Sequence, residues 1–135
     1  MILEKNLNIE IRKSILHGWG VFAINDISKN TLLEECHGLF LSTEDFKKIK
    51  SISGIGCNSF TIDKDKIMIP YGYGAIYNSK KDKTVITKFN KEKKTLDFYT
   101  IKDINANEEL FLNYEFARLI YKQEGIEIQK EPTRT

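Results

Sequence analysis

The chain has 135 residues, of which 41% are hydrophobic and 30% are charged, and its formal net charge is +2. A chain of this length is typical of one domain, and it can bury enough surface to form a core without disulfide or metal cross-links. No apolar stretch approaches the roughly 18 residues that a membrane-spanning helix needs. Residues 1–6 mix acid and base where a signal peptide has an apolar block. We therefore expect a soluble intracellular protein, or one exported by a route that the sequence does not show, with no membrane partner.

The first half of the chain predicts three short strands and one helix. Residues 8–12 alternate between polar and apolar types, and residues 21–24 form a short apolar run after a glycine-bounded turn. Residues 31–36 predict a third strand, which Gly38 closes. A Ser-Thr-Glu-Asp run then supplies an N-cap and acidic residues for a first turn, and so predicts a short helix at 43–50.

The second half of the chain predicts further strands separated by turns. Residues 51–59 are rich in glycine and favour a loop, residues 105–107 favour a turn, and residues 115–122 favour a short helix. Many short strands and few short helices indicate a mainly β fold, that is, a β-rich α+β domain. We expect residues 1–125 to form a single domain and residues 126–135 to be a frayed tail. The predicted strands are 60–62, 67–69, 85–89, 95–101 and 108–114.

Basic residues are concentrated in the middle of the chain. Residues 63–94 carry nine lysines against four acidic residues, a net charge of +5, whereas residues 97–135 have a net charge of −3. Such a segment could favour a nucleic acid or an acidic partner. Its interleaved acids and its lack of arginine instead favour an ordinary solvated surface, because arginine is the usual partner of phosphate. Nucleic acid is therefore not expected as a direct substrate, although a small basic RNA-binding β-barrel stays an alternative.

The cysteines and histidines do not predict a metal site. Cys36 and Cys57 are too few for a disulfide framework, and neither they nor His17 and His37 form a Cys-x-x-Cys or His-x3-5-His pair. We expect two buried cysteines that act as small hydrophobic residues, and no bound metal.

A first motif, Gly18-Trp19-Gly20-Val21-Phe22-Ala23, fits the loose dinucleotide-binding pattern G-x-G-x-x-A. That pattern needs a helix after it to face a pyrophosphate, and here a strand and a turn follow, so a Rossmann site is excluded. What remains is Trp19 between Gly18 and Gly20, where the backbone can approach a ligand closely. The alternative is a turn with a core tryptophan.

Two further motifs are weak when each is taken alone. Residues 72–79 combine glycines, Ala75 and Asn78, and an asparagine can both donate to and accept from an amino-acid group. The alternative there is a glycine-rich turn with surface tyrosines. Residues 108–114 end a mostly apolar strand with Tyr114, which places a hydroxyl beside apolar surroundings. Its alternative is a core tyrosine with a satisfied hydroxyl.

The order and spacing of these motifs resemble the SET-domain protein-lysine methyltransferases over roughly residues 8–116. The compact form is similar to the minimal stand-alone SET proteins of large DNA viruses and bacteria. The matching segments are 18–23 for the first motif, 33–38 for the following strand, 75–79 for the Asn-His signature and 108–114 for the segment with the catalytic tyrosine.

The resemblance implies a β-clip fold with a knot-like C-terminal segment, and methyl transfer from S-adenosylmethionine to a lysine side-chain amine. It assigns Tyr114 as the catalytic tyrosine. It implies that the target lysine lies in an extended segment of a histone or another basic protein. The methylation would take place in the cytoplasm of the producing cell or, for a viral protein, in the host nucleus. The residues that would bind the cofactor are Gly18, Trp19, Gly20, Ala75, Ile76, Asn78 and Ser79.

The chain departs from the family pattern at several places. Ser79 stands where the family usually has histidine, Lys83-Thr84 where it has Pro-Asn, and Cys36 where tyrosine is frequent. The family's cysteine-rich zinc segment does not follow Tyr114, so residues 115–123 or the second subunit of a homodimer would have to close the lysine channel. These departures leave a second class of function open, a catalytically silent SET-like module that binds proteins.

Overall fold

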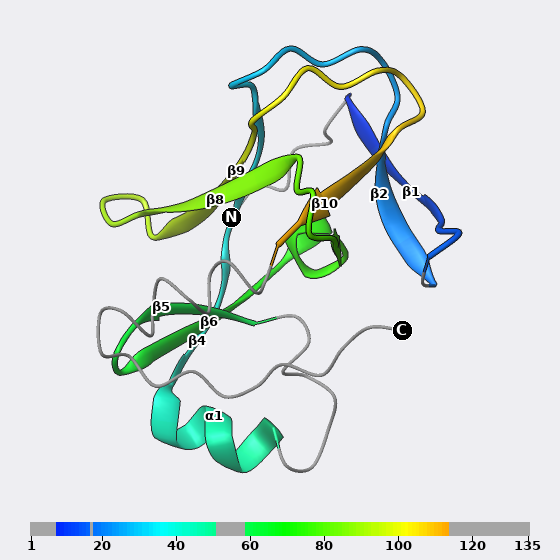
Figure 1. Ribbon diagram of the computed structural model, residues 1–135. Helices are drawn as coiled ribbons and strands as arrows, with labels where there is room; N and C mark the ends of the chain where they lie inside the picture. Colours follow the sequence, from blue (N-terminus) through cyan, green and yellow to red (C-terminus); the bar gives the residue numbers. More distant parts are fainter. Residues whose placement is uncertain (1–7, 17, 51–58, 114–135) are drawn as a thin grey trace.

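The computed structural model describes residues 8–16, 18–50 and 59–113 (Figure 1). In these ranges the chain forms short strands, one α-helix and a short 3-10 helix. The elements are β1 (Ile9–Lys13), β2 (Trp19–Ala23), β3 (Leu32–Cys36), β4 (Gly38–Ser42), α1 (Thr43–Lys50), β5 (Phe60–Asp63), β6 (Lys66–Pro70), the 3-10 helix η2 (Gly72–Ala75), β7 (Asn78–Ser79), β8 (Val85–Asn90), β9 (Thr95–Thr100) and β10 (Glu109–Leu112).

The strands form three small sheets. The first has the order β1-β2-β10-β7, in which β10 is antiparallel to β2 and parallel to β7. The second has the order β3-β9-β8 and the third the order β4-β6-β5, and both are antiparallel. In Figure 1, β4, β5 and β6 lie in the lower part of the molecule beside α1, and the other two sheets lie above them.

The hydrophobic core is built from all three sheets. Val21 of β2, Leu110 of β10, Phe98 of β9 and Met68 of β6 are fully buried. The ring of Tyr77 stacks on that of Phe98, with centroids 5.0 Å apart and planes 10° apart. Burying a large side chain of this kind stabilises a fold by roughly 1.5–3 kcal/mol. Because Tyr77 directly precedes β7, this packing also fixes where β7 begins.

Two connecting segments run side by side, one from β2 to β3 and the other from β9 to β10. The segment after β2 and the segment after β9 form a bridge between Ile27 and Ile104, whose backbone N–H groups each donate to the other's carbonyl at 2.8 Å (Figure 1). The turn before β10 is closed by a 3.1 Å hydrogen bond from the Glu108 N–H to the Asn105 carbonyl, and Asn107 has a φ of 71°. The turn predicted at 105–107 is therefore confirmed.

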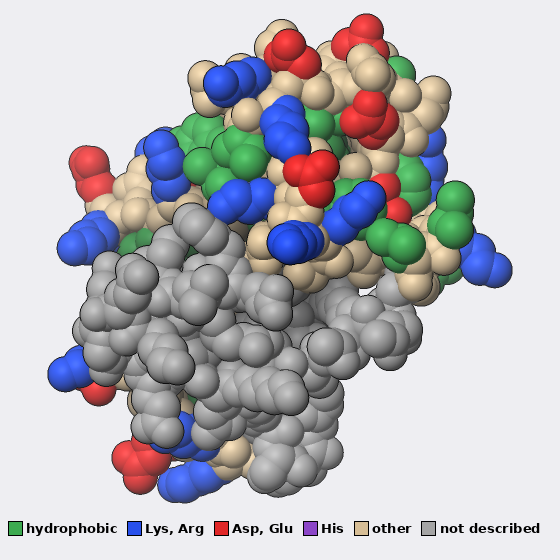
Figure 2. All heavy atoms as spheres, in the orientation of Figure 1, with side chains coloured by type: hydrophobic (Ala, Val, Ile, Leu, Met, Phe, Trp, Pro, Cys, Tyr) green, Lys and Arg blue, Asp and Glu red, His purple; other side chains and the backbone are tan. Residues whose placement is uncertain are grey.

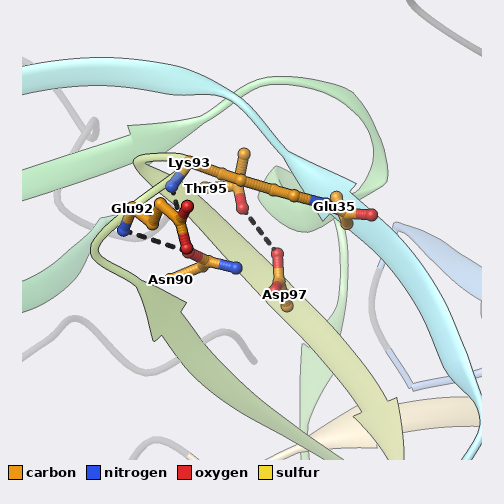
Figure 3. A network of polar contacts seen from close by, with 6 residues as sticks. All are labelled: Glu35, Asn90, Glu92, Lys93, Thr95 and Asp97. Atoms are coloured by element: carbon orange, nitrogen blue, oxygen red, sulfur yellow. Dashed lines mark hydrogen bonds and ion pairs between the residues drawn. The ribbon is translucent and has the colours of Figure 1, made fainter.

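A polar network fixes the β8–β9 turn to β3 (Figure 3). The side-chain oxygen of Asn90 accepts hydrogen bonds from the backbone N–H groups of Glu92 and Lys93, at 3.1 and 3.0 Å. The Lys93 ammonium then pairs with the Glu35 carboxylate on β3 at 3.2 Å. Water and salt screen an exposed pair of this kind, so the pair orients the turn more than it stabilises it.

Most of the predicted elements are confirmed. The helix spans Thr43–Lys50, and Ser42 is its N-cap, since its hydroxyl accepts from the Asp45 N–H at 3.0 Å. The predicted strands all occur, with ends that differ by up to two residues. The loop predicted at 51–59, apart from Ser59, lies outside the described residues, as do the helix predicted at 115–122 and the predicted frayed tail. The extent of the domain stays a prediction.

Three elements were not predicted, and the turn before β2 is shorter than expected. Trp19 and Gly20 belong to β2 instead of that turn. Gly38 begins β4 instead of closing β3, and a Cβ at Gly38 would lie 2.5 Å from the Ile69 carbonyl, so glycine is needed where β4 approaches β6. The elements η2 and β7 are short, and the partner of β7 is distant in sequence, so no local pattern predicts them.

Cys36 is buried, as predicted, and behaves as a small core residue. Burial raises the pKa of its thiol well above the ordinary range, and the neighbouring Glu34 carboxylate raises it further. Cys57 and His17 lie outside the described residues. Within residues 8–16, 18–50 and 59–113 no cluster of ligating side chains could hold a metal ion. The described residues also contain no helix long and apolar enough to cross a membrane.

We expect Cys36 to resist alkylation in the folded protein. In a Cys57→Ser variant, iodoacetamide at pH 8 should label Cys36 at least roughly 100-fold more slowly than it does in urea, because the buried thiol neither ionises nor meets the reagent. Intact-mass spectrometry over time measures both rates. Equal rates with and without urea would contradict the buried, neutral thiol.

Candidate functional site

The three sequence motifs meet because β10 pairs with β2 on one side and with β7 on the other. Leu110 lies opposite Val21 of β2, and Phe111 lies opposite Asn78 of β7. The backbone N–H of Lys80 donates to the Leu112 carbonyl at 2.8 Å and continues the parallel pairing. Segments that are far apart in the sequence therefore lie in one sheet, and Figure 1 shows β10 between β2 and the chain that follows η2.

The side chain of Asn78 connects all three segments. Its amide nitrogen donates to the backbone carbonyl of Trp19 at 3.1 Å and to a carboxylate oxygen of Glu109 at 2.8 Å. The side chain is 2% exposed, so water hardly competes for these bonds. An asparagine amide has two N–H groups, and both are used here. Toward any further group, Asn78 can act only as an acceptor, through its Oδ1 atom.

Glu109 extends this connection to the β1–β2 turn. Its second carboxylate oxygen accepts from the Ser14 hydroxyl at 2.7 Å. The Ser14 hydroxyl in turn accepts from the Leu16 N–H at 3.1 Å, and the Ser14 N–H donates to the Gly18 carbonyl at 2.7 Å. A chain of hydrogen bonds therefore runs from the turn before Trp19 to Asn78. Bonds to a carboxylate are among the stronger ones, at roughly 1.5–3 kcal/mol each.

The two glycines of the first motif are needed for different reasons. Gly20 is buried, and a Cβ placed on it would lie 2.3 Å from Glu109 Oε2 and 3.1 Å from Asn78 Nδ2. It leaves room for the carboxylate. Gly18 has a φ of +43°, which favours glycine, and a Cβ there would have no atom within 4 Å.

Trp19 is 63% exposed, so the alternative of a core tryptophan is wrong. Its backbone carbonyl is bound by Asn78, while its indole lies at the surface. Ile15 and Leu16, in the turn before it, are exposed as well, at 101% and 57%. The first motif therefore offers apolar surface close to the buried Asn78 and the half-buried Glu109.

The second motif forms η2 and β7. Ala75 ends η2, and the Ile76 N–H donates to the Tyr73 carbonyl at 2.8 Å. Ala75 and Ile76 are half-buried, whereas Ser79 is exposed and lies opposite Leu112. The alternative interpretation of this motif is a glycine-rich turn with surface tyrosines. It is wrong for Tyr77, which is fully buried in the core.

The third motif forms β10, in which Leu110, Phe111 and Leu112 are buried. Asn113 is the last residue before the chain leaves the described range, and its side-chain nitrogen donates to the Lys81 carbonyl at 3.2 Å. Tyr114 itself lies outside the described residues. Its catalytic role stays a prediction.

Sequence analysis did not single out Ser14 or Glu109. Glu109 is part of the third motif, but the interpretation there centres on the tyrosine. Ser14 is a polar residue in a turn with no pattern around it. Their hydrogen bond joins positions 95 residues apart. Only the order β1-β2-β10-β7 brings them together, and no local signal could have found the pair.

The lysines of the basic segment do not gather into one stripe. The ammonium groups of Lys66, Lys80 and Lys88 lie over the rings of Phe40, Phe111 and Tyr99, at 5.2–5.6 Å from the ring centroids. These three lysines belong to different sheets or connections. Figure 2 shows Lys and Arg side chains interspersed with acidic and hydrophobic ones over the upper part of the molecule. The distribution is that of a solvated surface with lysine stems packed on aromatic rings.

Comparison with known proteins identifies the family to which the three motifs belong. The family model described as the SET domain matches residues 18–115, the range that contains all three motifs. The chain belongs to the SET-domain family. This membership confirms the predicted β-rich SET fold, and family and relative together support protein-lysine methyltransferase activity. The family in general uses S-adenosylmethionine.

Similar proteins, in sequence or in structure, include one from a fungus and one from a protozoan parasite. A Schizosaccharomyces pombe protein named histone-lysine N-methyltransferase, H3 lysine-37 specific, is 26% identical over 106 residues, which are 78% of this chain and 72% of the relative. A crystal structure of a candidate histone methyltransferase from Plasmodium falciparum superposes with a TM-score of 0.66 at 24% identity, covering 83% of this chain and 95% of the other.

Part of a much larger chain also matches. A humanized mutant of the Chaetomium thermophilum Polycomb Repressive Complex 2, bound to an inhibitor, has a TM-score of 0.67 at 27% identity. The match covers 78% of this chain and 14% of that one, so the SET domain stands there within a far longer protein.

We predict that Gly20 and Glu109 are energetically coupled, whereas Gly18 and Glu109 are not. A Gly20→Ala methyl group would displace the Glu109 carboxylate from Asn78 and Ser14, and should lower the free energy of unfolding by about 1–2 kcal/mol. In a Glu109→Ala background the same change should cost roughly 1 kcal/mol less. Urea denaturation of the four proteins measures the coupling.

The matched control for this cycle is Gly18→Ala. Its cost, about 1 kcal/mol, comes from the left-handed backbone alone and should be equal in both backgrounds. If Gly20→Ala also costs the same with and without Glu109, the carboxylate does not occupy the space beside Gly20.

Proposed function

We propose that this SET domain transfers methyl groups from S-adenosylmethionine to lysine side-chain amines of a protein substrate. One observation carries the proposal. β10 lies between β2 and β7, and Asn78 joins Trp19 to Glu109 through hydrogen bonds of 3.1 and 2.8 Å. The arrangement brings the described parts of the three family motifs to one place, and the proposed catalytic Tyr114 follows Asn113 in the sequence.

The residues at this place suit the cofactor. S-adenosylmethionine supplies an activated methyl group on a positively charged sulfur, together with an amino-acid ammonium. Asn78 can meet such a ligand only as an acceptor, which fits an ammonium group. The exposed indole of Trp19 offers a flat apolar surface next to the glycine backbone of Gly18 and Gly20. We propose that Ala75, Ile76 and Ser79 line the adenine side, largely through their backbone.

The proposed role of Tyr114 follows from what methyl transfer requires. The lysine nitrogen must be neutral, because a protonated amine has no electron pair with which to attack the methyl carbon. Apolar surroundings and a nearby positive charge lower the pKa of a lysine and favour the neutral amine. In the sequence, Tyr114 follows the buried apolar residues of β10, from which Asn113 separates it. The Tyr114 hydroxyl would orient the amine in line with the methyl group.

The departures from the family pattern are compatible with activity. Thr84 stands where the family has asparagine, and its hydroxyl accepts from the Phe111 N–H at 3.0 Å, while its own N–H donates to the Phe111 carbonyl at 3.0 Å. The residue therefore holds β10 in place. Ser79 still pairs with Leu112 through β7. We therefore favour the enzyme over the catalytically silent binding module.

We propose a histone, or another basic protein that presents lysine in an extended segment, as the substrate. The Schizosaccharomyces pombe relative, by its name, acts on a lysine of histone H3. An extended segment can add to a sheet edge by backbone hydrogen bonds, which leaves the lysine side chain to enter the site. A homodimer in which the second subunit closes the lysine channel, and action in the producing cell's cytoplasm or a host nucleus, belong to the same proposal.

We expect Trp19→Ala to weaken binding of S-adenosylmethionine about tenfold while the melting temperature changes little, because the indole is exposed and contributes little to the core. Isothermal titration calorimetry and a thermal melt measure the two effects. Leu39→Ala is the control, since Leu39 is 46% exposed on β4 of another sheet and should bind like the wild type. A wild-type protein that binds no cofactor would favour the silent module.

We expect Tyr114→Phe to lower the turnover of histone H3 methylation by roughly 100-fold, in line with the loss of one positioned hydrogen-bonding group. The affinity for S-adenosylmethionine should stay within about threefold, because the tyrosine is proposed to act on the amine. Mass spectrometry of H3 after incubation with isotopically labelled cofactor locates the lysine and gives the rate. Full activity of the variant would refute the catalytic assignment.

A further inference from the structure

A carboxylate of a different sheet holds the turn that leads to Asn78. The turn is η2, and the carboxylate is that of Glu34 on β3. Its Oε1 atom accepts from the Tyr73 backbone N–H at 3.1 Å and from the Cys36 thiol at 3.0 Å. Glu34 and Tyr73 are 39 residues apart in sequence. The contact therefore fixes the position of η2 relative to β3.

Two glycines allow the turn to close on this carboxylate. Gly72 has a φ of +74°, and a Cβ on it would lie 2.8 Å from Glu34 Oε2. Gly74 is buried, and a Cβ on it would lie 2.9 Å from the Cys36 sulfur and from the ring of Phe98. Gly72 thus faces Glu34 itself, and Gly74 faces the ring of Phe98 and the thiol that donates to Glu34. The glycines of the second motif serve to bring backbone against β3 and β9.

Tyr77 connects the turn to Asn78 and lies within the influence of the same carboxylate. Burial raises the pKa of its phenol well above the ordinary value, and the negative charge of Glu34 raises it further. The phenol therefore stays neutral. The ring of Tyr77 stacks on that of Phe98, and this packing fixes the residue that directly precedes Asn78.

We propose that Glu34 is a positioning residue for the cofactor site: it anchors η2 so that Asn78 and the backbone after it meet S-adenosylmethionine in the correct place. The inference rests on the proposed function and adds a residue that neither the family motifs nor the comparisons assign. Glu34 acts through Tyr73 and η2. It is not proposed to touch the cofactor or the lysine.

The neighbouring Glu35 supplies a matched control. Adjacent residues of a strand point to opposite faces, and Glu35 accordingly pairs with Lys93 at 3.2 Å at the surface. Glu35→Gln removes a carboxylate charge from the same strand without touching η2. A general effect of charge or of strand β3 would appear in both variants, whereas an effect through η2 would appear only at Glu34.

The experiment compares Glu34→Ala, Glu34→Gln and Glu35→Gln in the full chain by calorimetry with S-adenosylmethionine and by steady-state kinetics on histone H3. We expect Glu34→Ala to raise the Kd and KM for S-adenosylmethionine about tenfold, as for loss of one hydrogen bond to a charged group. The turnover number and the KM for H3 should change less than roughly twofold, because only cofactor binding depends on η2. Glu34→Gln keeps an oxygen that can accept from Tyr73 and should remain within about threefold of wild type.

Each outcome decides between the proposals. If the wild type binds cofactor and Glu34→Ala binds it as well as Glu35→Gln does, the positioning role is wrong while the proposed function stands. If Glu34→Ala lowers turnover and leaves the cofactor KM unchanged, the role is again wrong. If the wild type binds no S-adenosylmethionine, the proposed function fails and this role fails with it. Should Glu34→Ala not fold, Glu34→Asp carries the same test, because its carboxylate is one methylene too short to reach Tyr73.

Discussion

The site depends on one buried amide. Asn78 donates to the Trp19 carbonyl and to the Glu109 carboxylate, and with these two bonds it ties β7 to β2 and β10. A buried donor that loses its acceptor costs roughly 1–3 kcal/mol. Each of the three segments is therefore held by the other two. The bond from Asn78 fixes the backbone of Trp19, although the indole of that residue is exposed.

Glycine has a separate task at three places where the backbone packs closely against a neighbouring group. Gly20 leaves room for the Glu109 carboxylate, Gly72 combines a left-handed backbone with proximity to Glu34, and Gly38 admits β4 against β6. Gly20 of the first motif and Gly72 of the second thus shape the site through the acids that they accommodate. Ligand contact by the glycine backbone, which the resemblance implies, is an additional role and not the one seen in the packing.

The local elements follow from sequence patterns, whereas the polar contacts of the site do not. Ser42 and the acids after it predict α1, and alternating or β-branched runs predict β1, β8 and β9. These signals act over a few residues. The bonds from Ser14 to Glu109 and from Tyr73 to Glu34 span 95 and 39 residues, so they depend on strand order and no periodicity encodes them. Only the resemblance to the family pointed to the meeting of Trp19, Asn78 and the third motif.

The parallel pairing of β7 with β10 sets the order in which this protein can mature. Strand β7 has two residues, and its parallel neighbour follows it by about thirty residues in the chain. Long-range parallel pairing forms slowly, because the loop must close before any bond is gained. A nascent chain on the ribosome therefore holds the first two motifs well before it holds the strand that unites them. A complete site for the proposed methyl donor would therefore exist only after synthesis has passed β10.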